Sequence, residues 1–86
     1  MNEIDFERAI INADDEAIKK LLQKTDKAIL VKALKASSPE ASGKIYQNMS
    51  AIESEGIKTE IKNIGPIKMQ EVESAQKKLV ELLSAL

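Results

Sequence analysis

The sequence predicts an all-α fold, a single domain over residues 1–86 built from about six short helices. Apolar residues recur at helical spacing along the chain, cap-forming residues mark the expected helix starts, and no segment alternates with the period of a β-strand. Hydrophobic residues make up 43% of the chain and charged residues 31%, which is ordinary for a folded domain. A chain of this length buries about 60–65% of its unfolded surface, so we expect modest stability.

Three short helices are expected in the first half of the chain. The first covers approximately residues 4–11. Asp14 is suited to cap the second, and Thr25 or Asp26 the third, because a side-chain oxygen can accept from the unpaired amides of a first turn. Each of these two helices carries an apolar stripe that needs a packing partner: Ala17, Ile18, Leu21 and Leu22 in one, and Ile29, Leu30, Ala33 and Leu34 in the other.

The segment 37–40 predicts the start of a fourth helix. Ser38 can cap it, Pro39 suits the first helical position, and Glu40 is expected to reach back to the cap amide. Its inward face carries Ile45, Tyr46 and Met49, and Gly43 weakens the helix by about 1 kcal/mol relative to alanine.

A fifth helix is expected between a capping box and a glycine stop. Ser50 and Glu53 form the capping-box pattern, and Gly65 followed by Pro66 ends the helix without any phosphate-binding role. A helical wheel divides the residues between two faces. Ile57, Ile61 and Ile64 lie inward, and Ile52, Gly56, Thr59 and Asn63 lie outward.

A long terminal helix is expected after Pro66. Glu71 and Glu73 lie near its start, where the helix dipole favours negative charge. Its apolar face is formed by Met69, Val72, Gln76, Leu79, Leu83 and Leu86, with Val80 and Leu82 widening the stripe.

Composition argues against several functional classes. The 13 basic and 14 acidic residues are interspersed, and Phe6 and Tyr46 are the only aromatic residues, so nucleic acid is not an expected partner. Cysteine and histidine are absent, which argues against a catalytic role, a bound metal or a cofactor. Carboxylates such as Glu53 and Glu60 are better explained as solvent-facing than as cation ligands. Without a leader or a long apolar run, we expect a cytoplasmic location and no membrane insertion.

An ordered series of motifs resembles one family across nearly the whole chain. The four motifs of the series are Ala33-Leu34-Lys35, Asn48-Met49-Ser50, Gly65-Pro66-Ile67-Lys68 and Val72-Glu73-Ser74-Ala75-Gln76. The series is similar to the C-terminal domain of the flagellar motor switch protein FliG, the part of the rotor that faces the stator. The resemblance implies an armadillo-like, right-handed helical array. It also implies a non-enzymatic role, in which helix charges meet opposite charges on the stator's cytoplasmic loop.

The resemblance assigns partner-binding roles to five positions, three of which keep the family's charge sign. Lys35, Glu60 and Lys68 keep it, although Lys35 and Lys68 are equally well explained as ordinary solvated charges. Thr59 replaces one residue of an acidic pair, and Ile52 replaces an arginine. We expect Ile52 to pack in the first helical turn against a neighbouring helix rather than to form an exposed contact.

Two functions remain open at this point. The first is a rotor-type domain of the motor switch that presents a helix to the stator for torque or switching, at the flagellar basal body. The second is a stand-alone helical adaptor with the same fold, which binds another protein through Ile52, Gly56 and Thr59. The family's hinge matches only at Phe6, and the given sequence does not include the family's upstream domains, so we expect an excised domain or a separately encoded relative. Its partner and oligomeric state are not fixed by the sequence.

Overall fold

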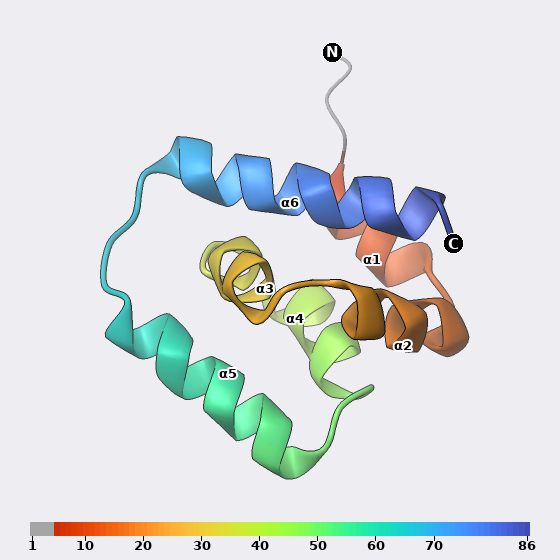
Figure 1. Ribbon diagram of the computed structural model, residues 1–86, viewed down its shortest axis with the longest axis horizontal. Helices are drawn as coiled ribbons and strands as arrows, with labels where there is room; N and C mark the ends of the chain where they lie inside the picture. The colour runs from red at the N-terminus through yellow and green to blue at the C-terminus, as the bar shows by residue number, and fades with distance from the viewer. Residues whose placement is uncertain (1–4) are drawn as a thin grey trace.

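Six α-helices follow one another along residues 5–86, the part of the chain that the computed structural model describes (Figure 1). They are α1 (Phe6–Asn12), α2 (Asp15–Lys24), α3 (Lys27–Leu34), α4 (Pro39–Tyr46), α5 (Ala51–Asn63) and α6 (Met69–Ser84). The predicted all-α fold is therefore confirmed, and residues 5–86 contain no strand. Ile4, where the first helix was expected to begin, lies outside the described residues.

Local capping explains where the first helices begin. Asp5 Oδ1 accepts from the Arg8 amide at 3.2 Å, and Asp14 Oδ1 accepts from the Ala17 amide at 2.9 Å. Asp26 occupies the cap position of α3, but its side chain makes no capping hydrogen bond. The prediction for Asp14 is confirmed, whereas Asp26 marks the start of α3 by position only.

The start of α4 corrects one sequence prediction. Ser38 accepts from the Ala41 amide at 3.1 Å as expected, but its own amide donates to Glu7 Oε2 of α1 at 3.0 Å and not to Glu40. The Ser38 hydroxyl also bonds to the second oxygen of Glu7. Glu40 is the second helical residue, one position short of the third-residue carboxylate that reaches back in a capping box. Two hydrogen bonds thereby join α1 to α4.

The core is organised around α3, which lies between α6 and α5 in Figure 1. Helix α3 buries Leu30, Ala33 and Leu34 of its predicted stripe, whereas Ile29 is only partly buried. It also buries Val31, because neighbours pack on more than one of its sides. Gln76 of α6 donates to the Ala33 carbonyl at 3.0 Å and joins α6 to the last turn of α3. The largest fully buried side chains come from four other helices: Ile10, Ile18, Leu21, Ile45 and Leu79.

The apolar face of α6 is shorter than the periodicity predicted. Val72 and Leu79 are buried, but Met69 is 59% exposed and Leu86 is 44% exposed. Both lie at the extremes of the predicted stripe: Met69 is the first residue of α6, and Leu86 lies beyond its end. Of the inward face predicted for α4, Ile45 is buried, while Tyr46 and Met49 are half-buried and Met49 lies beyond the end of the helix.

Candidate protein-interaction surface

Helix α5 is delimited by local signals at both ends. Ser50 Oγ accepts from the Glu53 amide at 3.1 Å, and Glu53 Oε1 accepts from the Ser50 amide at 3.0 Å. These are the two hydrogen bonds of a capping box. At the other end Gly65 has a φ of 68°, in the left-handed region that glycine adopts without steric cost, and Pro66 follows it. The ends of α5 therefore do not depend on its packing.

The C-terminal half of α5 is fastened to α3 and the turn after it. Lys27 Nζ lies 2.8 Å from Glu60 Oε2, and Lys35 Nζ donates to the Ile61 carbonyl at 3.1 Å. Ile57 is buried and Ile61 is half-buried against the core, whereas Ile64, also expected inward, is 38% exposed. Figure 1 shows α5 at an edge of the molecule, with α3 between it and α6.

Lys58 provides a further link, from α5 to α4. Its Nζ lies 4.9 Å from the centre of the Tyr46 ring, which is within cation–π range. Burial raises the pKa of the Tyr46 hydroxyl above its usual value of 10.0, so the phenol is neutral near pH 7. Sequence patterns do not predict this contact, because the two residues belong to different helices.

The outer face of α5 carries two of the five predicted partner-binding residues. Thr59 is exposed, and Ile52 is 86% exposed. The expectation that Ile52 packs against a neighbouring helix is therefore wrong: it lies in the first turn, on the outward face that the helical wheel indicated, and no helix covers that turn. Asn63 is also exposed, but Gly56 is half-buried and only partly outward.

The other three predicted residues lie apart from this face. Glu60 is half-buried in its ion pair with Lys27, and Lys35 is half-buried beneath the last turn of α5. Lys68 is exposed at the cap position of α6, beyond the Gly65 turn, and makes no capping hydrogen bond. The structure thus divides the five positions into an outward pair, a pair at the α3–α5 junction, and Lys68 alone.

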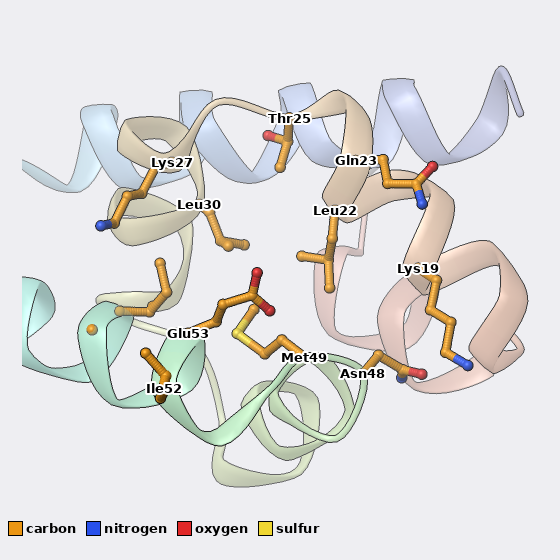
Figure 2. Close-up of a pocket in the computed structure, with 12 residues that line it drawn as sticks. Lys19, Leu22, Gln23, Thr25, Lys27, Leu30, Asn48, Met49, Ile52 and Glu53 are labelled. Carbon is orange, nitrogen blue, oxygen red and sulfur yellow. The ribbon is translucent and has the colours of Figure 1, made fainter.

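A groove that the sequence did not predict lies between α2 and the N-terminal half of α5 (Figure 2). Its volume is about 820 Å³. We call it the α2–α5 groove. It is lined by Lys19, Leu22, Gln23, Thr25, Lys27, Leu30, Asn48, Met49, Ile52, Glu53, Gly56 and Ile57. These residues come from three helices and two connecting segments, and only the tertiary arrangement brings them together.

Residues 5–86 hold no group of three or more metal-ligating side chains that could bind a metal ion. Within the same residues, no helix combines the length and the apolar character needed to cross a bilayer.

Comparison with known proteins identifies similar chains. A family model described as the FliG C-terminal domain matches residues 4–86. The flagellar motor switch protein FliG of Thermotoga maritima is 35% identical over 77 residues, which cover 90% of this chain and 23% of that protein. FliG of Vibrio cholerae is 36% identical over 73 residues, which cover 85% of this chain and 21% of that protein. The chain thus spans less than a quarter of these relatives.

A solved structure shares the fold. The crystal structure of FliG residues 116–343 from Helicobacter pylori matches with a TM-score of 0.90 at 34% identity. The match covers 96% of this chain and 36% of that one. The arrangement of the six helices in residues 5–86 is therefore one that a FliG fragment also adopts.

Proposed function

The chain belongs to the family of FliG C-terminal domains, and on that premise we propose that it is a non-enzymatic protein-interaction domain of the flagellar motor switch. It presents the outer face of α5 to the cytoplasmic loop of the stator, or to another protein of the switch complex. Its place is the cytoplasmic side of the flagellar basal body. The contact transmits torque or the change of rotational direction.

The exposure of α5 carries this proposal. Its inner face rests on α3, while Ile52, Thr59 and Asn63 on the opposite face are exposed, Ile52 to 86%. The outer face is flanked by the exposed charges of Glu55 and Lys62, and Lys68 follows beyond the turn. Charged groups at the edge of a contact steer partners and fix register more than they add affinity. Such a surface suits brief, repeated contacts with a moving partner.

Ile52 favours a second candidate function. It occupies the position where the resemblance implies arginine, and it gives the outer face an exposed apolar side chain in place of a charge. Thr59 likewise lacks the carboxylate of the implied acidic pair. A domain that has kept the fold but binds another protein through Ile52, Gly56 and Thr59 is consistent with both replacements.

Binding to a purified stator cytoplasmic loop distinguishes the two functions. If the motor function is correct, the 86-residue chain binds the loop, and affinity falls between low and moderate salt because screening weakens charge contacts. The double variant Ile52→Arg/Thr59→Asp should bind several-fold more tightly, as it restores both charges on one face.

A matched control makes the same charge changes elsewhere. The double variant Gln70→Arg/Ser74→Asp places them on exposed positions of α6 and should leave stator binding unchanged. Absence of binding by both the wild-type chain and the restored α5 variant, with both chains folded, would contradict the motor function and favour the adaptor.

A further inference from the structure

We propose that Lys27 of α3 is a specificity-determining residue for the outer face of α5. It neutralises the charge of Glu60 and thereby makes this surface a poor contact for basic segments of a partner. The inference rests on the proposed function, in which the outer face of α5 meets another protein, and it adds the partner chemistry that the surface disfavours. Lys27 and Glu60 belong to different helices, so no motif within α5 indicates this role.

The ion pair between these residues borders the outer face of α5. Lys27 Nζ lies 2.8 Å from Glu60 Oε2, and the two side chains are 58% and 46% exposed. Thr59, which precedes Glu60, is exposed on the outer face. A partner that contacts Thr59 therefore meets the carboxylate of Glu60 together with the ammonium group of Lys27. Opposite charges so close together largely cancel each other's effect on a third charge that approaches them.

Each of the three carboxylates in α5 is engaged within the domain. Glu53 accepts from the Ser50 amide in the capping box, and Glu55 Oε2 lies 3.9 Å from Lys58 Nζ of the same helix. Glu60 is the carboxylate whose cation comes from another helix. Basic residues of a partner would have to compete with these internal contacts, so the charge of Lys27 acts against partners that approach through such residues.

The stability of α3 does not account for a lysine at position 27. Lys27 is the first residue of α3, whose first turn contains no acidic residue. Positive charge is disfavoured at the N-terminus of a helix, and an exposed ion pair contributes little to folding. The ammonium group can therefore be removed without loss of the fold. Methionine is the suitable replacement, because it keeps an apolar stem of similar length.

Lys32 provides a matched control on the same helix. Its Nζ lies 3.6 Å from Glu71 Oε1, and the two side chains are each 45% exposed. Glu71 belongs to α6, and α3 lies between α6 and α5 in Figure 1. Lys32→Met thus removes one ion-paired, partly exposed lysine from α3, as Lys27→Met does, but on the side of α6.

The first experiment measures the electrostatic potential at α5 without any partner. Cationic and anionic nitroxide co-solutes of similar size relax nearby amide protons according to their local concentrations, and NMR gives the ratio of the two effects at residues 59–61. Lys27→Met should raise the cation-to-anion ratio by about twofold or more at low salt. Glu60→Gln should lower the ratio, and the double variant Lys27→Met/Glu60→Gln should return it to the wild-type value.

Lys32→Met should leave the ratio at residues 59–61 unchanged. Both lysine variants should melt within about 4 °C of wild type, so that a change in the ratio cannot be explained by unfolding. If Lys27→Met shifts the ratio no more than Lys32→Met does, Lys27 does not set the charge beside Thr59, and the proposal is overturned.

The second experiment measures specificity with two forms of a purified stator cytoplasmic loop. One form keeps its basic residues, and in the other they are replaced by glutamine. Lys27→Met should bind the basic form about two- to fivefold more tightly than wild type does, and the neutral form equally well. Unchanged affinity for the basic form, or an equal gain for both forms, would also overturn the proposal.

Failure of the proposed motor function gives a different result. In that case neither loop form binds any folded chain, including the Ile52→Arg/Thr59→Asp variant. The nitroxide ratio still decides the role of Lys27, because that measurement uses no partner.

Discussion

Replacing Lys35 with methionine tests whether this lysine supports α5 or contacts a partner directly. Lys35 Nζ donates to the Ile61 carbonyl at 3.1 Å, across 26 positions of sequence. Ile61 lies in the last turn of α5, whose carbonyls have no amide ahead of them in the helix. Methionine keeps an apolar stem of similar length but can donate no hydrogen bond.

The expected loss of stability is about 1–2 kcal/mol. A hydrogen bond to a charged group contributes about 1.5–3 kcal/mol, and a cation at a helix C-terminus about 0.3–1 kcal/mol. Because Lys35 is only half-buried, water can replace part of the bond in the variant, so we expect a loss near or below the lower end of the combined range, which is about 1.8 kcal/mol. For a domain of this size, the melting temperature should fall by about 4–16 °C.

Urea unfolding followed by circular dichroism measures this loss. Lys78→Met on α6 is the control, since Lys78 is exposed and has no ion-pair partner within residues 5–86. It should change stability by less than about 0.5 kcal/mol. If Lys35→Met were as stable as Lys78→Met yet lost partner binding, the structural role would be refuted and Lys35 would be a direct contact.

Three other predictions address α5, α6 and Tyr46. Ile57→Asp should lower the free energy of unfolding in urea by more than about 3 kcal/mol, because it buries an unpaired charge. Thr59→Asp should change the free energy of unfolding by less than about 0.5 kcal/mol, because Thr59 is exposed. Equal losses would show that the inward and outward faces of α5 are wrongly assigned. Lys68→Asp should raise stability by about 0.5–2 kcal/mol, because it supplies a capping carboxylate where α6 now has a cation; a lower melting temperature would contradict this. Burial raises the pKa of the Tyr46 hydroxyl in the folded state, so its neutral form stabilises the fold fully below the unfolded pKa, and this stability is lost as pH rises through the folded pKa. The variant Tyr46→Phe should therefore lose less stability than wild type above about pH 10. Identical plots of stability against pH for the two chains would exclude the effect.

The helices could be predicted from sequence because their signals are local. Asp14 and Ser50 each bond an amide three residues ahead, and Gly65 ends α5 through its own backbone conformation. The stripe of α3 was likewise visible as a spacing of apolar residues. These features depend on interactions between residues a few positions apart, and such interactions can be read directly from the sequence.

The errors arose where a distant residue decides the environment. The amide of Ser38 binds Glu7 and not Glu40, and these partners are 31 positions apart. Ile52 was expected to pack against a helix, but whether a helix covers the first turn of α5 depends on the tertiary arrangement. The α2–α5 groove was not predicted for the same reason. Family resemblance named Lys35 as a partner residue, and only the structure shows its bond to Ile61.

The capping of α5 at both ends has a consequence for how such a domain can evolve. Ser50 and Gly65 set the limits of the helix, and Ile57 secures it to the core, so its outer face contributes little to folding. Substitutions on exposed positions of this kind usually change stability by less than about 0.5 kcal/mol. Selection for a partner and selection for the fold therefore act on different residues of one helix. A lineage can therefore vary charge and apolar surface at exposed positions such as Ile52 and retain all six helices.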